Sequence, residues 1–173
     1  MKPKQSNEYI TLGTIAVVDI STPKHPEASM KIDLDVWLDL LDRGIGRVSH
    51  GTRYARVWFK GKSRTVHKMI TPSFKGCVDH INHDRIDNRL SNLRSVTHSE
   101  NSRNSPLSRA NKTGHCGIRV RKGVKGSTWA AQIRNDNKQI HLGTFKSLAK
   151  AIAARKAAEV KFGFHKNHGK EEI

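Results

Sequence analysis

The sequence predicts an α+β protein made of small modules, and three observations carry this prediction. Residues 1–74 mix β-patterned runs with one amphipathic helix. Residues 75–104 read as strand, loop, strand and helix, and residues 114–163 read as three strands followed by an alanine-rich helix. The predicted boundaries are a first domain at residues 1–104 with its core motif at 66–104, a linker at 105–113, a second domain at 114–163 and a basic tail at 164–173.

Residues 1–74, called here the lead-in, consist of short elements separated by turn residues. The expected elements are, in order, strands at 9–12 and 14–18 around Gly13, a loop at 21–29 with two prolines, a helix capped by Asp33 and stopped by Gly44, a strand at 53–59, a turn at Gly61-Lys62 and a return strand at 63–66. This segment offers basic side chains either to a nucleic-acid backbone or simply to solvent, and the pattern does not choose between the two. They are Arg53, Arg56, Lys60, Lys62 and Arg64.

The stretch from Lys75 to Asn104 organises the chain. Val78 to Ile81 is suited to a short strand, residues 88–92 to a turn, and Leu93 to Val96 to a return strand. Thr97 and Glu100 have the spacing of a capping box, so a helix is expected to start there. Polar side chains from these elements can then converge: Asp79, His80, Asn92, Asn101 and Asn104.

These residues resemble the His-Asn-His (HNH) nuclease motif, in the variant where Asn replaces the last His. The preceding Val66–Ile70 is similar to the lead-in of phage and intron-encoded HNH homing endonucleases. The resemblance implies a ββα-metal fold, on which the lead-in packs, holding one divalent cation against the scissile phosphate. It assigns the roles as follows: His80 is the general base, Asp79 and Asn101 are metal ligands, Asn92 braces the loop as part of the catalytic set, and Asn104 and His67 support the site.

Phosphodiester hydrolysis asks for these residue types independently of the family. A neutral imidazole can take a proton from water near neutral pH. Mg²⁺ or Mn²⁺ prefers oxygen ligands, which an Asp carboxylate and an Asn amide provide. Because neighbouring strand residues point to opposite faces, Asp79 and His80 need either a distorted strand end or a cation at the rim. His67 is either structural or a phosphate contact, whereas His83 and His98 are expected to be solvated.

The net charge of +17 and the pI of about 10.3 favour a polyanionic partner. Residues 112–173 carry 14 Lys and Arg against 4 Asp and Glu, so the last third is expected to hold DNA. Cys77 and Cys116 belong to no Cys-x-x-Cys pair, so no structural zinc is expected and a reducing cytoplasm is favoured, that of the host cell if the chain is phage-encoded. No secretory signal and no apolar run of about 18 residues is present, so neither export nor a membrane partner is expected.

Residues 105–113 contain breakers and no apolar periodicity, which is typical of a linker. Residues 114–163 resemble the plant ethylene-response-factor (ERF-type) DNA-binding domain, a three-stranded antiparallel sheet backed by one helix. Strand alternation predicts one DNA-facing set: Arg119, Arg121, Gln132, Arg134, Gln139 and His141. Gln132 and His141 stand where that family usually has Glu and Trp, which affects base preference more than fold.

The sequence therefore predicts a metal-dependent HNH endonuclease that hydrolyses double-stranded DNA, site-directed in the manner of homing enzymes. It is expected to act as a monomer or a transient dimer on DNA, and to need no small-molecule cofactor. One site per chain favours nicking. The alternatives are a non-catalytic, sequence-specific DNA-binding regulator and, less favoured, a basic RNA-associated protein.

Overall fold

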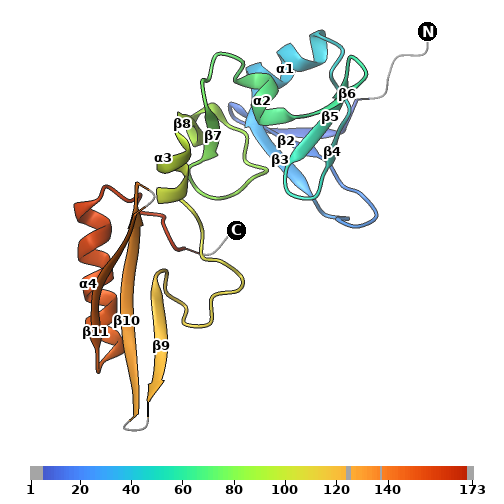
Figure 1. Ribbon diagram of the computed structural model, residues 1–173. Helices are drawn as coiled ribbons and strands as arrows, with labels where there is room; N and C mark the ends of the chain where they lie inside the picture. The colour runs from blue at the N-terminus through green and yellow to red at the C-terminus, as the bar shows by residue number, and fades with distance from the viewer. Residues whose placement is uncertain (1–5, 124–125, 137, 171–173) are drawn as a thin grey trace. The chain divides into compact units, whose positions relative to one another are not determined.

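The computed structural model describes residues 6–123, 126–136 and 138–170 (Figure 1), and its small sheets and helices confirm the predicted α+β class. The first five residues of the predicted lead-in and the last three of the predicted tail lie outside the described residues. The chain folds as two compact units, Met1–Val96 and Thr97–Ile173, called here the N-terminal and C-terminal units. The domain boundaries expected from sequence stay predictions.

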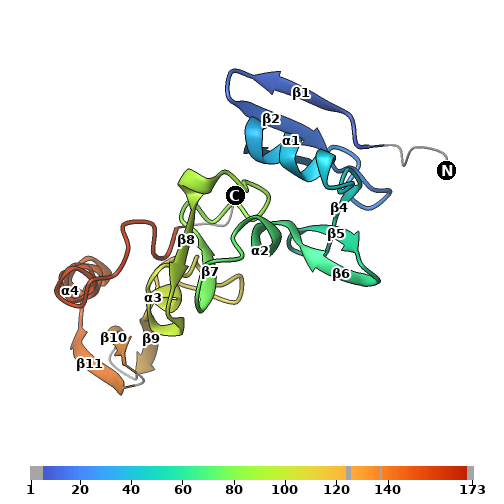
Figure 2. The ribbon, with the colours of Figure 1, turned by 90° about the horizontal axis from the view of Figure 1, so that it is seen from above.

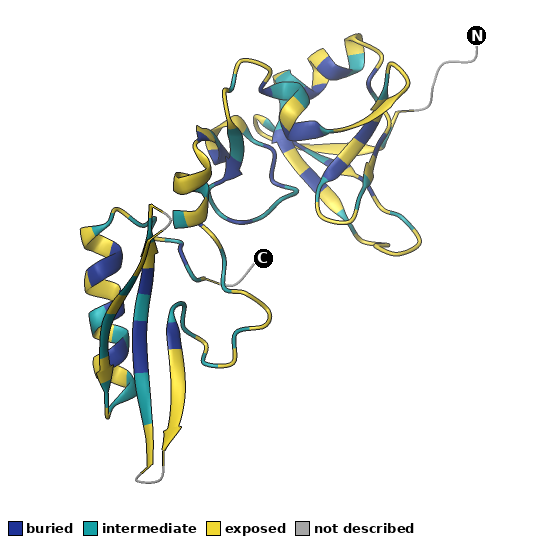
Figure 3. Ribbon diagram, in the orientation of Figure 1, coloured by how far each residue is buried: buried dark blue, intermediate teal, exposed yellow. Residues whose placement is uncertain are grey.

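The N-terminal unit begins with a three-stranded antiparallel sheet and one helix. Its elements are β1 (Tyr9–Leu12), β2 (Ile15–Asp19), β3 (Ser29–Asp33) and α1 (Leu34–Asp42). Alternate residues of β2 and β3 point inward, so Val18 and Ile32 are fully buried, and α1 adds Trp37 to the same core. Figure 2 shows α1 beside this sheet, and Figure 3 shows buried and exposed positions along its strands. Asp33 occupies the predicted cap position, but its carboxylate does not cap the helix; it accepts the backbone N–H of Leu90 at 2.7 Å.

A second antiparallel sheet completes this core. Its elements are β4 (Val48–His50), β5 (Ala55–Phe59) and β6 (Lys62–Thr65), followed by the short helix α2 (Val66–Ile70). The β5–β6 hairpin turns at Lys60 and Gly61, one residue before the predicted turn, because both residues adopt the positive φ that a tight hairpin needs (49° and 73°). Val66 therefore starts α2 rather than ending a strand. The sequence pattern also missed β3 and β4.

The predicted strand–loop–strand is present as a two-stranded antiparallel sheet. It consists of β7 (Cys77–His80) and β8 (Leu93–Val96), with a 3₁₀ turn at Leu90–Asn92 before β8. The return strand has the predicted bounds. His80 pairs with Leu93, and the Ile81 N–H still donates to the Asn92 carbonyl at 2.9 Å, so the pairing is regular to the end of β7.

The C-terminal unit opens with α3 (His98–Arg103). Thr97 and Glu100 form the predicted capping box, each side chain bonding the other's backbone N–H. An antiparallel sheet follows in the order β11-β10-β9, formed by β9 (Ile118–Gly123), β10 (Gly126–Asn135) and β11 (Lys138–Phe145), and it is covered on one face by α4 (Leu148–Lys161). Among the described residues no helix is long and apolar enough to span a membrane.

Candidate active site

Asp79 is a buried residue on β7 whose carboxylate is bonded by the guanidinium of Arg94. It lies directly opposite Arg94 on β8, and its Oδ2 accepts the Arg94 Nε–H at 2.9 Å and the Nη2–H at 2.8 Å. The side chain of Asp79 is 8% exposed and that of Arg94 is 33% exposed, so the pair is partly screened by solvent. The sequence motif identified Asp79 but gave no sign of this partner.

His80 is buried beside Asp79 in sequence but on the opposite side of the strand ladder. Its Nε2 lies 3.4 Å from Oδ1 of Asn88, which is also buried. Burial lowers the pKa of His80 below its ordinary value, although the Asn88 hydrogen bond and the carboxylates of Asp79, Asp84 and Asp87 act in the opposite direction. At neutral pH the ring is therefore uncharged and able to accept a proton.

A second buried imidazole stands against His80. The ring of His67, from α2, lies edge-on to that of His80 with the centroids 5.1 Å apart, and the Tyr54 ring lies 4.9 Å from His67. Burial, His80 and Lys68 lower the pKa of His67 to about 4. Its Nε2 is 3.2 Å from Oγ1 of Thr65, whereas its Nδ1 has no hydrogen-bond partner among the described residues. Burial favours the structural alternative for this residue over a phosphate contact.

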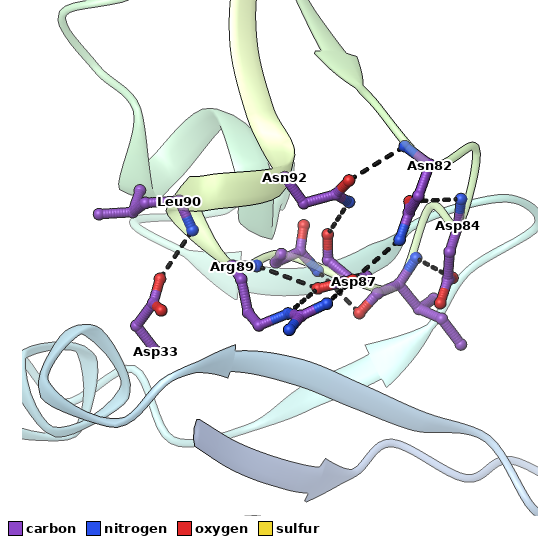
Figure 4. Close-up of polar contacts among 9 residues, drawn as sticks. Asp33, Asn82, Asp84, Asp87, Arg89, Leu90 and Asn92 are labelled. Atoms are coloured by element: carbon purple, nitrogen blue, oxygen red, sulfur yellow. Dashed lines mark hydrogen bonds and ion pairs between the residues drawn. The ribbon is translucent and has the colours of Figure 1, made fainter. Parts of the chain in front are cut away.

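The loop between β7 and β8 is built around the buried carboxylate of Asp87 (Figure 4). Arg89 donates to it through Nε at 2.8 Å and Nη2 at 2.6 Å, and the Asn82 amide donates at 2.9 Å. Burial alone would raise the pKa of Asp87, but these contacts, led by the Arg89 hydrogen bond, hold it below its ordinary value. Asp87 is not among the site residues predicted from the sequence, where its one local signal is the Arg89 that follows two residues later.

Asn92 joins the two ends of this loop. Its Oδ1 accepts the N–H of Asn82 at 3.0 Å, and its Nδ2 donates to the carbonyl of Asp87 at 2.9 Å (Figure 4). The acceptor oxygen and the donor nitrogen of the Asn92 amide thus both fix the loop that follows His80. The loop is also tied to the sheet of the N-terminal unit, because the Asn88 N–H donates to the Lys31 carbonyl at 2.7 Å.

The two histidines that flank the motif positions, His83 and His98, differ in burial. His83 was expected to be solvated but is only 5% exposed; it takes a positive φ of 70° in the turn after β7, and its N–H bonds the carbonyl of His80. His98 is exposed, as expected. The pairing is regular through Ile81, so the strand end is not distorted there, and a cation at the rim stays a prediction.

Asn101 and Asn104 belong to α3 in the C-terminal unit and are described within it. Asn101 is half-buried and its N–H continues the helix from the Thr97 carbonyl at 3.0 Å. Asn104 ends the helix, is 1% exposed, and its N–H donates to the Asn101 carbonyl at 3.1 Å. Their roles toward a cation stay predictions.

Asp79 and Asn101 offer oxygen atoms, which are the ligand type that a hard cation such as Mg²⁺ prefers. Among the described residues no group of three or more His, Cys, Asp or Glu side chains could hold a metal ion. Mg²⁺ does not require such a cage, because it keeps several waters and binds through one or two carboxylates together with substrate phosphates. Asp79 could serve in this way, provided that Arg94 shares its carboxylate.

The predicted DNA-facing set shares one face of the C-terminal sheet. Cross-strand neighbours lie on the same face, and the register pairs Gln132 with His141 and Arg134 with Gln139. Arg119 lies opposite Ala130, two residues before Gln132 and so on that same face; Arg121 follows by alternation. Their contact with DNA stays a prediction. Gln132, Arg134 and Gln139 also line a groove of about 600 Å³ within this unit.

Along the chain, a hairpin with a buried imidazole at the end of its first strand is followed by a capped helix, which is the order of elements that the HNH resemblance predicts. Comparison with known proteins agrees: residues 66–103 match the family model described as HNH endonuclease. The matched segment contains Asp79, His80, Asn92 and Asn101 and supports a nuclease that acts on DNA. The searches of curated proteins and of solved structures gave no match.

Proposed function

We propose that this protein is a metal-dependent endonuclease that hydrolyses phosphodiester bonds of double-stranded DNA. The observation that carries the proposal is the buried, uncharged imidazole of His80 beside the carboxylate of Asp79, inside the segment that matches the HNH family model. A general base must be deprotonated at working pH, and burial provides that state here.

His80 supplies the proton acceptor. Asn88 Oδ1 can only accept a hydrogen bond, so the tautomer that satisfies the contact carries its proton on Nε2 and leaves Nδ1 as the basic nitrogen. The edge of the His67 ring and the bonded loop restrict rotation of the His80 ring. A base held in one orientation loses less entropy when it meets the attacking water.

A divalent cation, Mg²⁺ or Mn²⁺, assigned by the motif to the oxygens of Asp79 and Asn101, would supply positive charge for the phosphate and the departing 3′ oxygen. The chain's own cation near that carboxylate is Arg94. Its two hydrogen bonds hold the Asp79 carboxylate in place, and it is positioned to contact a phosphate when DNA approaches.

The proposal is tested with supercoiled plasmid in Mg²⁺ or Mn²⁺, against an EDTA control. Replacing His80 by Ala is expected to lower the cleavage rate by about 10²- to 10⁴-fold while DNA affinity is kept. His98→Ala is the matched control, because His98 lies in the same motif but is exposed. Undiminished nicking by His80→Ala would refute the role of the imidazole.

A non-catalytic DNA-binding regulator is the alternative, and the Arg94 fork on Asp79 is the observation that favours it. A guanidinium that never released the carboxylate would block a cation there. Binding of plasmid by the wild-type protein, with no nicking at any Mg²⁺ or Mn²⁺ concentration, would establish this alternative.

We further propose that cleavage is site-directed, in the manner of homing enzymes, with the C-terminal sheet selecting the site. Its exposed Arg and Gln side chains can bond guanine and adenine edges. Mapping the cut ends on a genomic substrate tests this: clustered cuts in a common sequence are expected, on one strand if the monomer acts. Cuts scattered without preference would contradict it.

A further inference from the structure

A basic stretch without any acidic residue runs through the N-terminal unit and lies largely before the nuclease motif. Residues 43–78 hold nine Lys and Arg and no Asp or Glu, although the acidic residues of the chain number 15. Every residue of this stretch lies in the described part of the chain. A segment with cations and no compensating carboxylates favours a polyanionic partner.

The β5–β6 hairpin carries much of that charge together with one exposed aromatic ring. Ala55 and Val57 point into the core, so the intervening Arg56 and Trp58 face outward. Trp58 lies opposite Ser63 on β6, and the Arg56 Nε–H donates to Oγ of Ser63 at 2.9 Å. Lys60, Lys62 and Arg64 are exposed along the turn and the edge strand β6. Lys62 and Arg64 pair with Phe59 and Val57, so they extend from the face opposite Trp58, and the cation that shares the Trp58 face is Arg56.

Trp58 is 71% exposed, whereas Trp37 of the same unit is fully buried. Exposing so large an apolar surface is unfavourable in water, and the hairpin does not need the ring for its core, since Val57 and Ala55 supply that. Cations and an exposed aromatic ring on one element are the combination with which proteins bind nucleic-acid strands: the cations contact phosphates and the ring stacks on a base.

We propose that the β5–β6 hairpin is a second DNA-binding surface that a nucleic-acid strand meets along the exposed edge strand β6. Lys60, Lys62 and Arg64 contact phosphates from one face of the hairpin, and Trp58 stacks on an exposed base from the other. Base faces inside a duplex are covered by their neighbours, so the ring selects a base that is unpaired or unstacked. This inference rests on DNA being the substrate, but it is separable from hydrolysis, because it concerns binding alone.

The stacking half of the proposal is tested with the full chain in EDTA, which prevents cleavage. The probes are a single-stranded oligo(dT) and an abasic strand of the same length. Trp58→Ala is expected to weaken binding of oligo(dT) by about tenfold or more and to leave binding of the abasic strand unchanged. Trp58→Phe keeps an aromatic face and is expected to retain most of the affinity.

Leu38→Ala is the matched control, since Leu38 is a large exposed apolar residue on α1 of the same unit (43% exposed). Equal loss on both strands, or no loss on either, would overturn stacking by Trp58. Thermal unfolding of each variant separates a folding defect from lost binding.

The phosphate half is tested by salt dependence. The double replacement of Lys60 and Lys62 by Gln is expected to weaken both strands alike and to reduce the slope of log affinity against log salt by about 1.4, or about 0.7 for each phosphate contact. Lys24 and Lys31, exposed elsewhere in the N-terminal unit, give the control double replacement. Equal slopes for both double variants would overturn the proposal. Intact strand binding by a protein that nicks no plasmid would refute the hydrolytic function and leave this surface standing.

Discussion

The two units of this protein are stabilised by different interiors. The N-terminal unit buries large apolar side chains from two sheets and a helix, with Trp37, Met30 and Ile32 fully inaccessible. In the described part of the C-terminal unit, Ile118, Ala131 and Ala151 form a small buried apolar cluster and Ile133 is also buried. Larger residues packed against the cluster are only partly buried: Trp129, Leu142, Phe145 and Leu148.

The C-terminal unit adds a buried ion pair to its small core. The Arg155 Nε–H donates to the Glu159 carboxylate at 2.9 Å, with both side chains less than 10% exposed. Arg155 also donates to the Gln132 carbonyl at 2.6 Å and so ties α4 to the sheet. Such a network is specific in geometry but contributes little net stability, whereas apolar burial contributes much.

The larger core lies in the unit that carries His80, so the candidate general base is attached to the more rigid scaffold. His80 and its loop are attached to the unit with the large core, through bonds such as the one from Asn88 to Lys31. A general base needs a fixed orientation, which a well-packed scaffold provides. The C-terminal sheet keeps a polar, exposed face, which suits recognition of a partner.

The largest expected effect follows from removing the centre of the apolar core. Trp37→Ala is expected to lower the free energy of unfolding by about 3–5 kcal/mol, because a buried ring leaves a cavity. Trp58→Ala is the control and should change it by less than about 0.5 kcal/mol, since that ring is exposed. Urea unfolding followed by circular dichroism measures both; equal losses would contradict the description of the core.

A somewhat smaller effect is expected from breaking the buried ion pair. Glu159→Gln leaves Arg155 buried without its counter-charge and is expected to cost about 3 kcal/mol. Lys156→Gln removes the exposed partner of the same carboxylate (61% exposed) and should cost less than about 1 kcal/mol. If chemical unfolding shows the two variants to be equally stable, the buried pair contributes no more to stability than the exposed one.

The stability of the two units is also expected to depend differently on pH in the acid range. Folding lowers the pKa of His67 from 6.5 to about 4, so the unfolded chain binds more protons between these values and stability falls as pH falls from 6.5 to 4. The loss is on the order of 3 kcal/mol for the N-terminal unit. For Glu159, burial raises the pKa, but the bonds from Lys156 and Arg155 outweigh it and the pKa is lowered, so its contribution is lost only below the ordinary value of 4.5.

Unfolding measured at several pH values between 4 and 7 tests this difference. His67→Gln cannot titrate and should flatten the profile of the N-terminal unit over that range. A slope that survives unchanged in His67→Gln would assign the acid sensitivity to another group.

The sequence was sufficient for the parts that are determined by neighbours in the chain. The return strand at Leu93–Val96 and the Thr97–Glu100 capping box depend on residues a few positions apart, and both are confirmed. The alternation of β10 and β11 likewise put Gln132 and Gln139 on one face, where their side chains bond each other at 2.5 Å. Local periodicity and cap chemistry decide such features.

The contacts of the candidate site depended on residues that are distant in the chain. The bond between Asp33 and the N–H of Leu90 spans 57 positions, and Asp33 was expected only to cap a helix. The burial of His83 followed from a positive φ that no sequence pattern announced.

By itself, the sequence determined the basic charge, the strand–loop–strand–helix order and the residue types available for hydrolysis. Only the tertiary structure decided which imidazoles are uncharged and what holds them, as in the packing of His67 against His80. The physical reason is that a pKa and a ring orientation depend on burial and on neighbours brought together by folding, and neither is encoded in the spacing of residues along the chain.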